Sequence, residues 1–81
     1  MKYKICWLEN FPDMKSYRQR RKEVRHAEIT GDCMGDIEVE VWEYFEAEND
    51  EQAKRYVREH YHEREVFTVF RAERVFTEED I

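Results

Sequence analysis

Residues 36–62 read DIEVEVWEYFEAENDEQAKRYVREHYH, and the spacing of apolar residues changes within this stretch. Up to position 47 the apolar and polar residues alternate, which is typical of a β-strand with two different faces. One face carries Ile37, Val39, Val41, Phe45 and Ala47, and the other carries Glu38, Glu40, Trp42, Tyr44, Glu46 and Glu48. After this strand the apolar residues recur at helical spacing, so the stretch predicts a strand followed by a helix.

The helix is predicted over residues 49–62. Asn49 is a favourable N-cap, and Gln52 three residues later completes a variant of the capping box. Asp50 and Glu51 fall in the first turn, where the helix dipole favours acidic side chains. The apolar positions of this helix are Ala53, Tyr56, Val57, His60 and Tyr61. They share one face, which we expect to pack on a sheet.

Two further segments have the composition of strands. Residues 2–9 alternate, with Tyr3, Ile5 and Trp7 on one face, and this strand ends at a turn containing Pro12. Residues 66–76 are rich in β-branched and aromatic side chains, which predicts one final strand. With the strand at 37–47 and the helix it can form a βαβ unit with a right-handed crossover. The polar tail 77–81 is expected to fray.

The stretch 14–30 is compatible with two structures. The turn chemistry of residues 31–36, GDCMGD, favours a long hairpin in which 20–30 pairs with 36–47. The alternative is a helix at 14–26, although three consecutive basic residues, Arg20, Arg21 and Lys22, interrupt its apolar stripe. We predict the hairpin.

The charges on either side of that turn have opposite sign. The segment 15–25 contains six basic residues and one acidic residue, whereas 36–51 contains eight acidic residues and no basic one. In the predicted hairpin, Arg25 or Lys22 lies opposite or diagonal to Glu40 or Glu43. Such cross-strand pairs contribute roughly 0.2–1 kcal/mol each and would set the register.

These elements predict one α+β domain over residues 1–81, in the order ββ(β)αβ, with one helix on a mostly antiparallel sheet. At 81 residues the chain has no room for a second domain or for an enzyme cleft of ordinary volume. The formal net charge of −6 opposes binding to nucleic acid and to anionic membranes. No apolar run approaches the ~18 residues of a membrane span, and no signal peptide is recognisable, so we expect a cytoplasmic protein with thiols at Cys6 and Cys33.

The sequence contains residue types that can bind metal ions or act in catalysis, but they do not have the spacing of metal-binding or catalytic motifs. The potential metal ligands are Cys6, Cys33, His26, His60 and His62, and they form no CxxC, HExxH or paired arrangement. We expect His60 to pack under the helix and His62 to be solvated. Nothing marks either cysteine as an activated nucleophile. The sequence therefore predicts a protein that is not an enzyme and holds no metal or cofactor.

Both faces of the predicted sheet carry apolar residues, and a single helix covers only one of them. The second face would expose some of Leu8, Trp42, Tyr44, Phe67 and Val69. A symmetric dimer is the commonest way to bury such a surface, so we predict a homodimer.

Two surfaces are candidates for binding. Carboxylates interleaved with aromatic residues at Glu38, Glu40, Trp42, Tyr44 and Glu46 indicate a protein-interaction surface, since aromatic anchors are typical interface hot spots. The alternative is a small nucleic-acid-binding regulator that uses the basic run 15–25 through Arg18, Arg20, Arg21 and Arg25. A site for a small molecule at an oligomer interface is a third, more distant alternative.

The segment YFEAENDEQAKRYVREH, followed by a strand, resembles a strand–helix–strand pattern of small phage and mobile-element proteins. Some anti-CRISPR proteins are similar in size and element order. The resemblance covers residues 44–76. It implies a protein that blocks a host nucleic-acid-binding complex by protein contact, in the host cytoplasm, and it assigns no functional residue.

Overall fold

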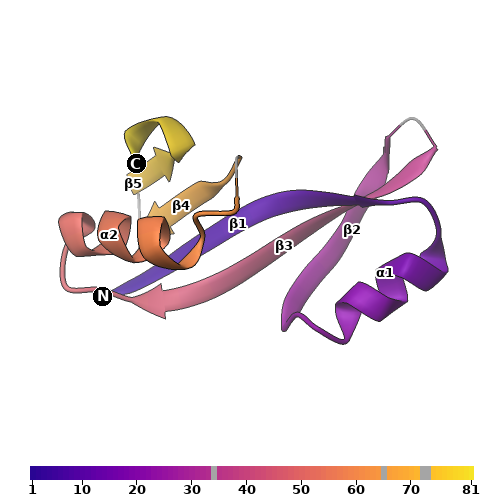
Figure 1. Cartoon of the computed structure of the whole chain (residues 1–81), viewed down its shortest axis with the longest axis horizontal. Coiled ribbons are helices and arrows are strands. Elements are labelled where there is room, and N and C mark those ends of the chain that lie inside the picture. The colour runs from indigo at the N-terminus through magenta and orange to yellow at the C-terminus, as the bar shows by residue number, and fades with distance from the viewer. Residues whose placement is uncertain (34, 65, 72–73) are drawn as a thin grey trace. The chain divides into compact units, whose positions relative to one another are not determined.

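The structure is a computed structural model that describes residues 1–33, 35–64, 66–71 and 74–81, and the side chain of Cys33 lies outside this description. The elements in chain order, drawn in Figure 1, are β1 (Lys2–Phe11), α1 (Met14–Arg21), β2 (His26–Cys33), β3 (Asp36–Glu46), α2 (Asp50–His60), β4 (Thr68–Arg71), β5 (Arg74–Thr77) and the 3-10 helix η1 (Glu78–Asp80).

The strands form an antiparallel sheet in the order β2-β3-β1-β4-β5. Helix α2 connects β3 to β4, but β1 lies between these two strands in the sheet. The β-α-β unit is therefore split, as in ferredoxin-like connectivity, and β5 extends the sheet by one strand. The predicted α+β class is confirmed. The element order differs from the prediction, because α1 follows β1 and two strands follow α2.

The chain divides into two compact units. Unit 1 consists of Met1–Ile5 and Tyr44–Ile81, and unit 2 consists of Cys6–Glu43. Each unit has its own buried apolar residues. In unit 1 these are Tyr3, Ile5, Phe45, Ala53, Val57, Phe67 and Val69, and in unit 2 they are Trp7, Val39 and Val41.

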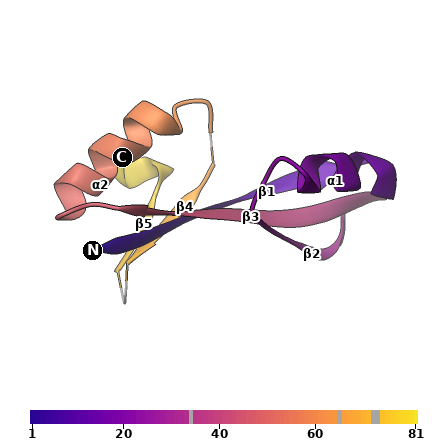
Figure 2. The same ribbon diagram turned by 90° about the horizontal axis from the view of Figure 1, so that it is seen from below.

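Unit 1 is organised by α2, which lies to one side of β1, β4 and β5 (Figure 2). Asn49 caps the helix by accepting a 2.9 Å hydrogen bond from the Gln52 amide, and the Gln52 side chain accepts one from the Glu48 amide. Ala53 and Val57 are buried, as the apolar spacing predicts. His60 differs from the prediction: it is exposed and stacks on Tyr56 instead of packing beneath the helix.

The predicted final strand at 66–76 is two strands. β4 and β5 pair antiparallel, with Val69 opposite Phe76 and Phe70 opposite Val75. Residues 72 and 73, which join β4 to β5 in the sequence, lie outside the described residues. We expected residues 77–81 to fray, but they contain the last residue of β5 and the 3-10 helix η1. Asp80 accepts a 2.9 Å hydrogen bond from the Thr77 amide.

In unit 2, β2 and β3 form the predicted hairpin over a shorter range. His26 lies opposite Trp42 and Cys33 opposite Asp36, and the register shifts between Ile29 and Gly31. Gly35 adopts a φ of +89°, which glycine reaches without the steric cost that a β-carbon brings. The strand pairing predicted for residues 20–25 is wrong, because β2 begins only at His26.

Residues 14–21 instead form α1, the alternative that we did not favour. Asp13 caps this helix by accepting a 2.8 Å hydrogen bond from the Ser16 amide, and this bond lowers the pKa of the Asp13 carboxyl. Arg18, Arg20 and Arg21 fall in the last turn, where the helix dipole favours cations. No residue of α1 is buried, and the interrupted apolar stripe of this segment did not identify the helix.

Candidate functional site

The basic run is anchored to its own unit through Arg20. Its guanidinium donates two hydrogen bonds to the Glu9 carboxylate, at 2.8 and 2.9 Å, and a third to Glu23 at 3.1 Å. The Arg20 side chain is 25% exposed and that of Glu9 only 16%. The hydrogen bond to Glu9, above all, raises the pKa of Arg20. Arg20 therefore attaches α1 to β1, and three of its N–H groups are already bonded to carboxylates.

The other arginines of the nucleic-acid alternative are less constrained. Arg21 donates hydrogen bonds to the carbonyl oxygens of Val24 and Arg25, beyond the end of α1. Arg18 and Arg25 are exposed. Neither Arg25 nor Lys22 lies on β2, and Glu40 lies opposite Glu28, so the predicted charge pairing with Glu40 across the hairpin is wrong.

The residue opposite Glu40 is another acid, Glu28. Directly opposed residues of an antiparallel pair point to the same face, so the two carboxylates are neighbours. Neither forms an ion pair with any residue that the structure describes. Like charges in this position destabilise a sheet, and the fold therefore retains an unfavourable pair here.

An aromatic pair lies beside these two carboxylates. His26 stacks on Trp42 with ring centroids 5.4 Å apart and the planes 14° from parallel. At the other end, Thr30 donates a 3.0 Å hydrogen bond to the Glu38 carboxylate, which fixes that side chain at the irregularity of β2. We call this set the acidic surface, and it consists of His26, Glu28, Glu38, Glu40 and Trp42.

The acidic surface lies on the face of β3 opposite to the buried residues Val39 and Val41, because residues alternate along a strand. Helix α1 contacts odd-numbered residues of β1, with Tyr17 against Phe11 and Arg20 against Glu9. Within unit 2, the helix therefore does not cover the even-numbered face. Leu8, an even-numbered residue of β1, is 59% exposed.

The remaining two residues of the predicted interaction surface belong to unit 1. Tyr44 is 45% exposed, and the Lys2 ammonium lies 4.4 Å from the centroid of its ring. Glu46 pairs with the amino group of Met1 at 3.2 Å. The predicted set of five is thus divided: Glu38, Glu40 and Trp42 belong to the acidic surface, and Tyr44 and Glu46 have cationic partners in unit 1.

Around Tyr44, unit 1 presents a surface of the opposite charge. The Lys4 ammonium lies 6.0 Å from the centroid of Phe70, and Val75, opposite Phe70 in the β4–β5 pair, is 53% exposed. We call this set the lysine–aromatic surface, and it consists of Lys2, Lys4, Tyr44, Phe70 and Val75. Phe67 and Val69, which we expected on an uncovered face, are buried in unit 1 instead.

Sequence reasoning missed His26 and Glu28 as members of the site. Both lie in a segment that was predicted to be a strand, and both fall on its even-numbered positions. The signal was therefore present, but it required the register that places Glu28 opposite Glu40. The predicted register paired Glu40 with a basic residue, so it did not reveal the contact between Glu28 and Glu40.

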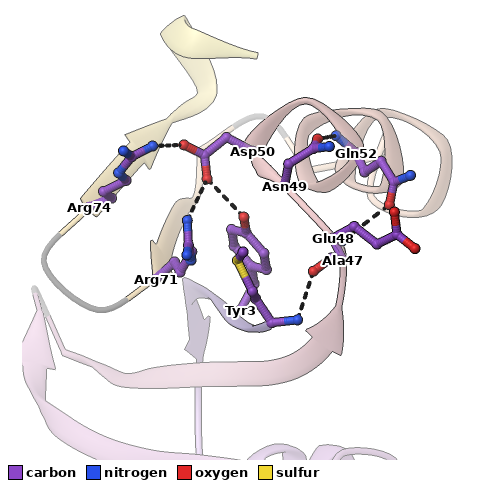
Figure 3. Close-up of polar contacts among 9 residues, drawn as sticks. Tyr3, Ala47, Glu48, Asn49, Asp50, Gln52, Arg71 and Arg74 are labelled. Carbon is purple, nitrogen blue, oxygen red and sulfur yellow. Dashed lines mark hydrogen bonds and ion pairs between the residues drawn. The ribbon is translucent and has the colours of Figure 1, made fainter.

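A separate polar cluster in unit 1 has a structural role (Figure 3). Asp50, in the first turn of α2, accepts a 2.8 Å hydrogen bond from the Tyr3 hydroxyl and pairs with Arg71 and Arg74. The hydrogen bond from Tyr3 leads the interactions that lower the pKa of Asp50. Burial, followed by the bond to Asp50, raises the pKa of Tyr3. The cluster ties α2 to β1, β4 and β5.

The described part of the chain contains no group of three or more His, Cys, Asp and Glu side chains placed to hold a metal ion. The helices described include none long and apolar enough to cross a membrane. A hollow of about 240 Å³ beside α2 is lined by Val57, Arg58, Tyr61, His62, Arg64, Phe67, Glu78 and Ile81.

The chain was compared with protein-family models, with curated proteins and with solved structures, and none of the three comparisons finds a match.

Proposed function

We propose that this protein is a protein-interaction module whose acidic surface binds a lysine- and arginine-rich segment of a partner. The observation that carries the proposal is the position of Glu28 directly opposite Glu40. Two carboxylates held side by side repel each other, and a cation placed between them replaces that repulsion with attraction. A cost that the free protein bears is thereby relieved on binding.

The aromatic pair beside the carboxylates supplies the apolar part of such a site. A guanidinium group stacks on an aromatic face while its N–H groups hydrogen-bond to a carboxylate. Trp42, stacked on His26 and two residues from Glu40 on the same face, suits this double recognition. Arginine is therefore the side chain that fits the acidic surface best.

Proteins that carry exposed arginine-rich segments include many that bind nucleic acids, because such segments contact phosphates. Occupying one of them with carboxylates would exclude the nucleic acid. The net charge of −6 would also attract a basic partner and accelerate its association. We therefore propose that the module inhibits a nucleic-acid-binding complex, which is also the role that the resemblance to anti-CRISPR proteins implies.

The test is a fluorescence-anisotropy titration of a labelled arginine-rich peptide. We expect the Glu28→Gln/Glu40→Gln variant to bind at least tenfold more weakly than the wild type. The matched control is Glu59→Gln/Glu79→Gln, which removes the same charge from exposed positions of α2 and η1. Equal affinities for the two double variants would show that only net charge matters, and the proposed site would be wrong.

The inhibitory role requires a second measurement. A complex of the labelled peptide with a short DNA duplex is titrated with the protein, and the release of DNA is followed. The wild type should displace the DNA, and Glu28→Gln/Glu40→Gln should not. Formation of a ternary complex, with the DNA retained, would contradict inhibition while leaving the interaction module in place.

A further inference from the structure

The lysine–aromatic surface of unit 1 has the composition that the acidic surface of unit 2 requires in a partner. It offers two ammonium groups, Lys2 and Lys4, beside two aromatic rings, those of Tyr44 and Phe70. The acidic surface offers carboxylates beside the stacked His26–Trp42 pair. One surface is cationic and the other anionic, and both include aromatic rings.

The spacing of the charges also agrees. Lys2 and Lys4 are two residues apart on β1, and Glu38 and Glu40 are two residues apart on β3. Side chains at i and i+2 on one face of a strand are separated by roughly 7 Å, twice the rise per residue. Two lysines on one strand can therefore meet two glutamates on another without either strand changing its conformation.

Apolar surface is available to accompany these charges. Tyr44 is 45% exposed and Val75 is 53% exposed in unit 1. In unit 2 the corresponding group is Leu8, which is 59% exposed and lies on the even-numbered face of β1. Sheets that pack face to face bury side chains of this kind between them. Contact would remove apolar area from water while it pairs the charges.

We propose that the lysine–aromatic surface of one copy of this chain binds the acidic surface of a second copy. A dimer in which each copy gives and receives one such contact has two-fold symmetry. The inference rests on the proposed function, since it uses the same acidic surface. It identifies a second copy as an occupant of that surface, which an arginine-rich partner must displace.

The experiment is a charge exchange followed by sedimentation velocity at micromolar concentrations. The wild type should sediment as a dimer, with twice the 10.1 kDa mass of one chain. Lys2→Glu/Lys4→Glu makes both surfaces acidic, and Glu28→Lys/Glu40→Lys makes both basic. Each variant alone should be monomeric, because its two surfaces repel. An equimolar mixture should restore the dimer, because each variant then supplies the charge that the other has lost.

Matched controls separate this contact from a general effect of net charge. Lys15→Glu/Lys22→Glu and Glu59→Lys/Glu79→Lys change the net charge by the same amounts at exposed positions elsewhere, and both should remain dimeric. Circular dichroism establishes that each variant is folded. Should Lys4→Glu lower the unfolding temperature, Lys2→Glu alone is mixed with Glu40→Lys, and the same restoration is expected.

A monomeric wild type, or a mixture that does not associate, would overturn the inference. The two proposals fail separately. A monomer that still binds the arginine-rich peptide leaves the proposed function standing and removes the dimer. A dimer that is restored in the mixture but does not bind the peptide supports self-association and contradicts the proposed function.

Discussion

Glu28 of β2 and Glu40 of β3 lie directly opposite each other across an antiparallel pair, on the same face as the stacked rings of His26 and Trp42. The sequence pattern alone indicates the opposite arrangement, in which Glu40 meets Arg25 or Lys22. The two arrangements predict opposite effects of Glu40→Lys on the free energy of unfolding, so a measurement can distinguish them.

We predict that Glu40→Lys stabilises the protein. The substitution replaces a like-charge pair by an opposite-charge pair with Glu28, and the free energy of unfolding should rise by about 0.5–1 kcal/mol. Glu79→Lys, at an exposed position in η1, should change stability by less. Urea denaturation of the two variants makes the comparison, at a protein concentration where both are monomeric, so that loss of the proposed dimer contact does not contribute. Destabilisation by Glu40→Lys would indicate a basic neighbour and a different register of the hairpin.

The attachment of α1 predicts a coupling between Arg20 and Glu9. Their side chains form two hydrogen bonds and are only partly exposed, so the interaction should exceed that of an ordinary surface ion pair. A double-mutant cycle with Glu9→Gln and Arg20→Gln should give a coupling free energy of about 1 kcal/mol. The matched pair Glu59→Gln and Arg20→Gln should be additive. Additivity in both cycles would mean that α1 is not held by this contact.

The parts of the fold that could be predicted are those whose signals are local. Helix α2 has a capping residue at Asn49, acids in its first turn and an apolar face, and these agree with one another. Strand β3 alternates from Asp36 to Val41, and its turn toward β2 contains Gly35. Each of these features is specified by residues close together in the chain.

Helix α1 could not be recognised in this way, because none of its residues is buried, and it contacts β1 through the Arg20–Glu9 pair and the rings of Tyr17 and Phe11. Its connection to β1 depends on Arg20 reaching Glu9, which is eleven residues away in the chain. The division of the last strand is a second failure of local signals. Residues 65–76 contain no Gly, Pro, Asn or Asp that would mark a turn. Among the site residues, Glu28 required the hairpin register, which its own sequence neighbourhood does not specify.

The polar cluster around Asp50 predicts a pH dependence of stability. The pKa of Asp50 in the folded protein is lowered, chiefly by the Tyr3 hydroxyl and further by Arg74. An aspartate with a lowered folded pKa stabilises the protein above its unfolded pKa of about 3.9, and this contribution is lost as the pH falls through the folded value. Asp50→Asn should therefore lower the unfolding temperature at neutral pH and flatten its fall below about pH 4.

Two control variants make this result specific. Tyr3→Phe keeps the ring that stacks on Phe45 but removes the hydroxyl, so it should reproduce part of the effect of Asp50→Asn. Asp36→Asn changes an exposed carboxylate at the start of β3, and its unfolding temperature should still fall below about pH 4 as that of the wild type does. If the unfolding temperatures of Asp50→Asn and the wild type fall in parallel in this acidic range, the cluster does not hold α2.

The last prediction concerns nucleic acid, the alternative ligand of the basic run. Binding to phosphates releases counterions, so a protein that used α1 for this purpose would bind tightly at low salt and lose affinity steeply as salt rises. We expect almost no binding of single- or double-stranded oligonucleotides even at low salt. The net charge of −6 repels phosphate, and Arg20 is already paired with Glu9 and Glu23.

The contacts of the arginines determine which substitutions test nucleic-acid binding by the basic run. Arg20→Ala would loosen α1 as well as remove a cation, so a loss of binding in that variant has two explanations. Arg18 and Arg25 are exposed and lie outside the Glu9 contact, so Arg18→Ala/Arg25→Ala removes charge without removing the attachment of the helix. Steeply salt-dependent binding that this double variant abolishes, with circular dichroism unchanged, would establish α1 as a nucleic-acid surface. The basic run would then be the functional site, and the acidic surface would have to be explained by self-association alone.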